Sequence, residues 1–357
     1  MTRQTGAPQG NPAANRNPGT TPGGGTSHDV GAGWSAGAEA AGDAGTAGRT
    51  GPVPPRSVAV IGAGTMGHGI ARVFAAGGVP VRLADRTVEL ARAGRDAIAA
   101  SLPERDATVV DLVTPVGDIA EAVTGAALVI EAVPEDLALK QVVWQAIGAH
   151  APRDATLASN TSSYDIGLLA TAAGAPARVL GMHWYNPAYL VPCVEVVRTA
   201  AVEPGRVEAV LGWLTALGKR PAVTANTAGF VGNRLQFAMV AEAFRCLAEG
   251  VATARDIDAI VRGSFGFRLG DYGPFEIADL AGLDVYRAIL DYLAEHLGER
   301  FATPPNLVEL TAAGRYGAKS GGGVYEWPGE TARRARADRD RRLAARLNSI
   351  DAGGQNR

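Results

Sequence analysis

The chain has 357 residues, of which 46% are hydrophobic and 20% are charged, a composition typical of a globular protein large enough for two domains. Its formal net charge of -2 excludes an overall basic field, so we expect neither a nucleic-acid partner nor a membrane partner. The two cysteines, Cys193 and Cys246, argue against a disulfide framework and a cysteine-ligated zinc site, so we expect a cytoplasmic protein without a metal.

The first segment, 1–55, is rich in Gly, Ala, Pro, Ser and Thr and has scarcely any large apolar residue, which predicts a disordered tail. The apolar run at 58–61 is typical of a buried parallel strand. Further strand candidates lie at 79–84, 127–132, 156–159, 179–183, 194–197 and 222–224, and helical stretches alternate with them. This alternation predicts an α/β fold with a Rossmann-type, doubly wound parallel sheet over 56–226.

The pattern changes after about residue 226. Apolar residues then recur three and four positions apart, as in Leu235, Met239 and Val240, which is the spacing of a helix with one buried face. We therefore predict an all-helical C-terminal domain over 227–328, to which the family resemblance given below assigns substrate binding and dimerisation. The segment 329–357 carries many arginines among acidic and alanine residues and predicts a solvated terminal helix or tail.

A glycine-rich loop follows the first predicted strand directly. It has the pattern GxGxxG, and its predicted cofactor-binding residues are Gly62, Gly64, Thr65, Met66 and Gly67. The first glycine permits a tight turn, the second lets the backbone approach a pyrophosphate, and the third allows the next helix to pack closely. The N-terminus of that helix adds N–H groups and a partial positive charge. The loop therefore predicts a dinucleotide site, with a plain glycine-rich turn as the structural alternative.

Asp85 stands at the end of the next predicted strand, 18 residues beyond Gly67. A carboxylate at this place accepts hydrogen bonds from both ribose hydroxyls and repels a 2'-phosphate, which favours NAD as the cofactor. Arg86 is the neighbouring residue, and an arginine there would instead hold that phosphate. NADP therefore stays open as the alternative cofactor.

His183 ends another strand candidate, at the edge where an open α/β sheet binds its ligands. Glu195 lies in the apolar stretch 194–197, where an unpaired carboxylate would be costly to bury. An imidazole exchanges protons near neutral pH, and a carboxylate on its second nitrogen fixes the tautomer and stabilises the imidazolium. His183 and Glu195 therefore form a candidate general-base dyad for oxidising an alcohol, although a lone histidine is more often structural.

Eight segments together resemble the L-3-hydroxyacyl-CoA dehydrogenases over residues 57–327. They are VAVIGAGTMGHGIA at 58–71, EAVPEDLALK at 131–140, ASNTSS at 158–163, GMHWYNP at 181–187, VEVV at 194–197, GFVGNR at 229–234, GPFEIADLAGLD at 273–284 and GAKSGGGVY at 317–325. The resemblance implies a reversible NAD-dependent oxidation of a 3-hydroxyacyl-CoA thioester to the 3-keto product. His183 would be the base and Glu195 its orienting partner.

The same resemblance implies further site residues. Ser162 and Asn233 would hydrogen-bond the substrate oxygens near C3, although either residue could also serve only at the start of a helix. The remaining cofactor contacts would be Asn186 near the nicotinamide, Glu135 and Lys140 along the cofactor, and Lys319 from the second domain. A homodimer formed through the helical domain is also implied.

The substrate is left open by the sequence. Family members that act on CoA thioesters carry a long helical excursion that helps to hold CoA, whereas only 45 residues separate Asp85 from Glu131 here. The motifs HWYNPAYLVP and DLAGLDVY also resemble relatives that act on small hydroxy acids, on carnitine or on pyridine-carboxylate alcohols. Two other classes are a noncatalytic NAD-binding structural protein and a hydrolase using Ser162 with His183. The hydrolase lacks a GxSxG elbow and leaves the dinucleotide loop unexplained.

Overall fold

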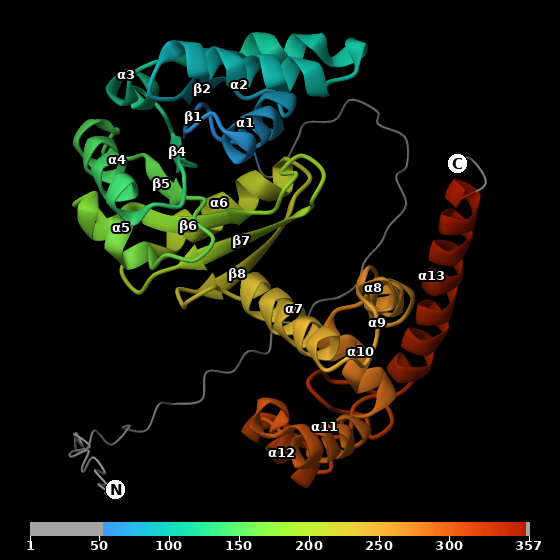
Figure 1. Ribbon diagram of the computed structural model, residues 1–357. Coiled ribbons are helices and arrows are strands. Elements are labelled where there is room, and N and C mark those ends of the chain that lie inside the picture. Colours follow the sequence, from blue (N-terminus) through green and yellow to red (C-terminus); the bar gives the residue numbers. More distant parts are fainter. Residues whose placement is uncertain (1–52, 355–357) are drawn as a thin grey trace, which may run out of the picture. The chain divides into compact units, whose positions relative to one another are not determined.

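The computed structural model describes residues 53–354, and the predicted tail over 1–55 lies outside them except for its last three residues. The first described part of the chain builds one sheet of eight strands (Figure 1). The strands are β1 Val58–Ile61, β2 Val81–Ala84, β3 Val113–Val116, β4 Leu128–Glu131, β5 Thr156–Ser159, β6 Val179–Trp184, β7 Cys193–Arg198 and β8 Arg220–Ala225.

The sheet has the order β3-β2-β1-β4-β5-β6-β7-β8. Every neighbouring pair is parallel except β6 and β7, which pair antiparallel, so β7 and β8 run against the first six strands. The predicted doubly wound sheet is therefore confirmed, with a reversal at one end. Strand β3 was not predicted from the sequence. It is an edge strand that contains Pro115, and its pattern lacks a continuous apolar run.

Helices separate all consecutive strands except β6 and β7, and they cover both faces of the sheet. They are α1 Thr65–Ala76, α2 Val88–Ser101, η1 Glu104–Leu112, α3 Ile119–Val123, α4 Leu137–His150, α5 Ile166–Ala172, η2 Pro176–Arg178 and α6 Pro204–Ala216. On one face, Val58 and Val60 of β1 join apolar side chains of α1, α2 and α6. On the other face, Ala59 and Ile61 join side chains of α3, α4 and α5. This alternation explains why the strand is apolar at every position.

The second part of the chain is helical, as predicted. Its helices are α7 Gly232–Ala248, α8 Ala254–Gly263, α9 Phe265–Leu269, α10 Pro274–Ala281, α11 Leu283–Leu297, η3 Glu299–Phe301, α12 Pro305–Ala312 and α13 Thr331–Gly354 (Figure 1). Several large apolar side chains of these helices are more than half exposed, namely Leu235, Phe237, Phe244, Ile260, Phe275 and Tyr292. Over residues 53–354, none of the helices is both long and apolar enough to cross a membrane.

Candidate active site

A groove of about 1100 Å³ runs along the residues that follow β1, β2 and β4, which is the edge where open α/β sheets bind ligands. The predicted site residues that line this groove are Gly62, Gly64, Thr65, Met66, Asp85, Glu135 and Ser162. Segments that are far apart in the sequence therefore meet along one surface. Gly67 lies beneath the loop and is buried.

The three glycines of the loop have different surroundings. Gly62 has a φ of +103°, and a Cβ atom there would lie 2.6 Å from the Ala132 carbonyl oxygen. A Cβ atom on Gly67 would lie 1.7 Å from the Gly62 oxygen, whereas one on Gly64 would meet nothing within 4 Å. The backbone is therefore tightly packed at the first and third glycines and open at the second, where a phosphate could approach it.

Asp85 directly follows β2, and backbone N–H groups fix its carboxylate. Oδ2 accepts a hydrogen bond from the Ala63 N–H at 2.8 Å, and Oδ1 accepts one from the Arg86 N–H at 2.7 Å. A carboxylate offers about four acceptor positions, so both oxygens can accept further donors. Gly64 and the Asp85 carboxylate line the same groove, and together they fit a dinucleotide whose ribose carries no 2'-phosphate.

His183 and Glu195 face each other across the antiparallel pair β6 and β7, in which they are directly paired residues. Side chains at directly opposed positions project from the same face of a sheet. The distance from His183 Nδ1 to Glu195 Oε2 is 2.7 Å, and the two residues are only 3% and 4% exposed. The other ring nitrogen, Nε2, has no protein hydrogen-bond partner among the described residues, so it is the nitrogen available to a substrate.

Glu195 accepts four hydrogen bonds. Oε1 accepts from the backbone N–H groups of Val231 and Gly232 at 3.0 and 2.9 Å. Oε2 accepts from the Tyr185 hydroxyl at 2.7 Å in addition to its contact with His183. Burial alone would raise the pKa of Glu195, but these hydrogen bonds outweigh it and lower the pKa to about 2. The carboxylate is therefore negatively charged at neutral pH.

Ser162 and Asn233 come from the two parts of the chain and are joined by a hydrogen bond. Asn233, in the first turn of α7, donates its side-chain N–H to the Ser162 carbonyl oxygen at 2.9 Å. Gly232, which bonds to Glu195, is the preceding residue of the same helix. The start of α7 therefore contacts both the dyad and the Ser162 turn.

The turn that carries Ser162 is held by Glu135. One carboxylate oxygen of Glu135 accepts from the Thr161 hydroxyl at 2.6 Å, the Ser162 N–H at 3.0 Å and the Ser163 hydroxyl at 3.0 Å. The other oxygen pairs with Lys140 at 3.2 Å. Burial would raise the pKa of Glu135, but the Thr161 hydrogen bond and the Lys140 charge outweigh it and lower that pKa.

Lys140 is almost wholly enclosed, with 1% of its surface exposed. Its ammonium group donates to Glu131 Oε1 at 2.7 Å, and Glu131 is 0% exposed. Glu131 also accepts from the Trp144 indole at 3.1 Å and the Ser159 hydroxyl at 2.7 Å. The structure therefore gives the Lys140 ammonium two carboxylate partners below the groove and does not place it among the groove-lining residues.

Two other predicted cofactor contacts lie outside the groove lining. Lys319 pairs with Asp284 at 2.5 Å in the helical part of the chain. Asn186 is exposed and precedes a cis peptide bond to Pro187. The structure therefore brings neither side chain together with the residues that line the groove. Among the described residues, no group of three or more His, Cys, Asp or Glu could hold a metal ion.

Sequence reasoning missed two polar residues of this site, Tyr185 and Glu131. A signal existed for each of them. Tyr185 stands two positions after His183, directly after the end of β6, and the period of two of the strand, continued by one residue, places both on one face. Glu131 ends β4 as a charged residue in an apolar run, which is the same signal that identified Glu195.

Comparison with known proteins gives matches over both parts of the chain. A family model described as the NAD binding domain of 3-hydroxyacyl-CoA dehydrogenase matches residues 57–227. A second model, described as the C-terminal domain of 3-hydroxyacyl-CoA dehydrogenase, matches residues 229–327. Helix α13 begins after the second match ends.

Individual relatives match this chain over almost the whole of their own length. The 3-hydroxybutyryl-CoA dehydrogenase of Mycobacterium tuberculosis is 36% identical and covers 76% of this chain and 98% of its own length. The 5-formyl-3-hydroxy-2-methylpyridine 4-carboxylate 5-dehydrogenase of Mesorhizobium japonicum is 34% identical and covers 81% of this chain and 96% of its own length. The solved 3-hydroxyacyl-CoA dehydrogenase of Archaeoglobus fulgidus is 32% identical, with a TM-score of 0.71, and covers 82% of this chain and 99% of that one.

Proposed function

Because the chain belongs to the 3-hydroxyacyl-CoA dehydrogenase family and is an NAD-dependent oxidoreductase acting on a CH–OH group, we propose that His183 is its general base and Glu195 the orienting partner. The observation that carries this proposal is the 2.7 Å contact between His183 Nδ1 and a Glu195 carboxylate that is ionised at neutral pH. The contact leaves Nε2 as the nitrogen that faces a substrate hydroxyl.

The proposed chemistry follows from this arrangement. NAD held at the glycine-rich loop and Asp85 would supply the hydride acceptor for the carbon that bears the hydroxyl. His183 Nε2 takes the hydroxyl proton, and its Nδ1–H donates to Glu195, whose negative charge stabilises the imidazolium. Asn233 follows Gly232, which bonds to Glu195, and its side chain donates to the Ser162 carbonyl oxygen; we assign Ser162 and Asn233 hydrogen bonds to the substrate oxygen.

The cofactor site is proposed at the groove. We assign the pyrophosphate to the loop of Gly62, Gly64, Thr65, Met66 and Gly67, and the ribose hydroxyls to Asp85. Glu135 lines the same groove and is proposed to contact NAD as well as hold the Ser162 turn. Lys140 is proposed to act through Glu135, because its ammonium group is paired with two carboxylates. Asn186 and Lys319 stay proposals that rest on the family resemblance alone.

The substrate is a 3-hydroxyacyl-CoA of the 3-hydroxybutyryl-CoA kind, oxidised at C3 to the 3-keto thioester. A second candidate is a small hydroxylated acid that carries no CoA, such as carnitine or a pyridine-carboxylate alcohol. One observation favours the second candidate. The segment between β2 and β4 holds only α2, η1, β3 and α3, so it offers few helical residues that could bind CoA. The similarity to the pyridine-carboxylate dehydrogenase also supports it.

A substrate panel separates these candidates. Purified protein with NAD is offered 3-hydroxybutyryl-CoA, free 3-hydroxybutyrate, carnitine and a pyridine-carboxylate alcohol, and NADH formation is followed by absorbance. We expect turnover of the thioester. Turnover of a free acid alone would move the assignment to the second candidate, and NAD binding without turnover of any substrate would support a noncatalytic protein.

The base assignment has its own test. His183→Ala should lower kcat by at least about a hundredfold while leaving NAD affinity nearly unchanged, because only proton transfer is lost. His296→Ala is the matched control, since this exposed histidine lies at the end of α11 and contacts Tyr292. Unchanged turnover in His183→Ala would remove the base assignment.

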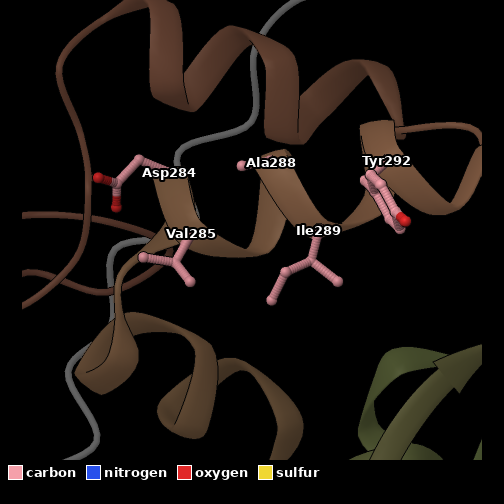
Figure 2. A pocket seen from close by; sticks show the side chains of 5 residues that line it. All are labelled: Asp284, Val285, Ala288, Ile289 and Tyr292. Atoms are coloured by element: carbon pink, nitrogen blue, oxygen red, sulfur yellow. The ribbon is translucent and has the colours of Figure 1, made fainter.

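We also propose that the protein forms a homodimer through its helical part and works in a reducing cytoplasm. An apolar hollow of about 430 Å³ on α11 is lined by Asp284, Val285, Ala288, Ile289 and Tyr292 (Figure 2). Exposed apolar side chains also lie on α7, α8 and α10, and a second copy that covered them would remove them from water. Sedimentation velocity tests the dimer, and a monomer at micromolar concentration would oppose it.

Both cysteines are free, which is consistent with reducing conditions.

A further inference from the structure

Tyr185 is a second polar neighbour of the dyad, and the chemistry above gives it no role. It stands just beyond the end of β6, and its hydroxyl donates to Glu195 Oε2 at 2.7 Å. The same oxygen contacts His183 Nδ1 at 2.7 Å, and the phenol and imidazole ring centroids lie 4.7 Å apart. The phenol and the imidazole therefore share one acceptor atom.

The residues around the Tyr185 hydroxyl fix its position. A Cβ atom on Gly232 would lie 1.7 Å from the Tyr185 oxygen, so the first residue of α7 leaves room for the phenol only because it is glycine. Burial first, and then the hydrogen bond to Glu195, raise the pKa of Tyr185. The phenol therefore stays protonated at neutral pH and stays a donor.

Few other groups act on the shared carboxylate. Cys193 lies on the same strand as Glu195, and burial and the Glu195 charge raise the pKa of its thiol, so it is neutral. From the start of α7, the facing groups are the two backbone N–H donors of Val231 and Gly232. Phe230 contributes an apolar ring, whose centroid lies 5.7 Å from that of His183. Tyr185 is thus the neutral side-chain donor that competes with the imidazole.

We propose that Tyr185 is a positioning residue that tunes the base through Glu195, an inference that rests on the assignment of His183 as that base. Its hydroxyl draws part of the negative charge of Oε2, so the carboxylate stabilises the imidazolium less strongly than it would alone. Removing the phenol would therefore let Glu195 hold the imidazolium more strongly. Tyr185 itself transfers no proton.

The test is the pH dependence of kcat/KM for oxidation of 3-hydroxybutyryl-CoA by NAD, or of the free acid if the panel above selects one. In Tyr185→Phe the acidic limb should move to higher pH by roughly half a unit, because one hydrogen bond to a charged group is lost. The rate on the high-pH plateau should stay within about threefold of the original rate, since the base is still present.

Tyr189→Phe is the matched control. Tyr189 lies on the segment that follows β6, and its ring keeps its contact with Arg72, whose guanidinium carbon is 3.9 Å from the ring centroid. This variant loses a hydroxyl that does not touch Glu195, so its profile should superimpose on the original. A profile of folded Tyr185→Phe that is unchanged, or that moves to lower pH, would leave the phenol a packing role and overturn the inference.

A second replacement tests the same proposal if Tyr185→Phe fails to fold. Incorporation of 3-fluorotyrosine at position 185 keeps the ring and makes the phenol a stronger donor, so the acidic limb should move to lower pH. A shift in the same direction as that of Tyr185→Phe would contradict the proposal. Failure of the base assignment is recognised separately, because His183→Ala would then keep its turnover and its acidic limb.

Discussion

Replacing Glu195 with glutamine should reduce the change in the free energy of unfolding with pH at acid pH. Burial alone would raise the pKa of this carboxyl, but hydrogen bonds from an imidazole, a phenol and two backbone N–H groups lower it from 4.5 to about 2. The folded chain therefore binds this proton more weakly than the unfolded chain does. The resulting stabilisation is fully present above pH 4.5 and is lost as the pH falls toward about 2. At about 1.4 kcal/mol per pH unit, a difference of about 2.5 units corresponds to about 3 kcal/mol.

Urea unfolding at a series of pH values measures this effect. At neutral pH, Glu195→Gln should be less stable than the original protein by up to about 3 kcal/mol, and the two free energies of unfolding should converge as the pH falls from about 4.5 to about 2. Glu208→Gln serves as the control, because this carboxylate is exposed on α6, and its profile should follow the original. A constant gap between Glu195→Gln and the original protein over this range would refute the reasoning.

Three further changes test other contacts. Lys140→Met should lower the free energy of unfolding at neutral pH by about 3–5 kcal/mol, measured in urea, because the fully buried Glu131 loses its cation. Asp85→Ala should raise KM for NAD by roughly tenfold or more with little change in kcat, measured by initial rates at varied NAD. Gly232→Ala should lower kcat by roughly tenfold without weakening NAD binding, followed by NADH fluorescence, since the new methyl group would crowd Glu195 Oε2 as well as the Tyr185 hydroxyl.

Much of the fold could be predicted because its signals are local. The apolar run of β1 and the glycines that follow it are adjacent in the sequence, and each residue acts on its near neighbours. The reversal of β7 could not be predicted, because an apolar strand such as Val194–Val197 has the same pattern in either direction. Strand β3 was missed because an edge strand has only one neighbour to pair with and tolerates Pro115.

The sequence could predict a pair of interacting site residues, but it could not predict a network of several residues. His183 and Glu195 each imply a partner of the other kind, and the antiparallel pairing of β6 with β7 brings them together. Lys140 was different, because a lysine on a helix is normally exposed and its burial depends on Glu131, nine positions away on a strand. No spacing along the sequence encodes a contact that exists only after α4 packs on the sheet.

The charges around the dyad also decide which group can move a proton. Glu195 is ionised at neutral pH because its pKa is about 2, so it is a poor proton acceptor there. The pKa values of Tyr185 and Cys193 are both raised, mainly by burial, so neither group releases a proton readily. Glu195, Tyr185 and Cys193 thus each keep one protonation state at neutral pH. Since the His183 ring keeps Nε2 free of protein partners among the described residues, these charges support the proposal that a substrate proton passes through His183.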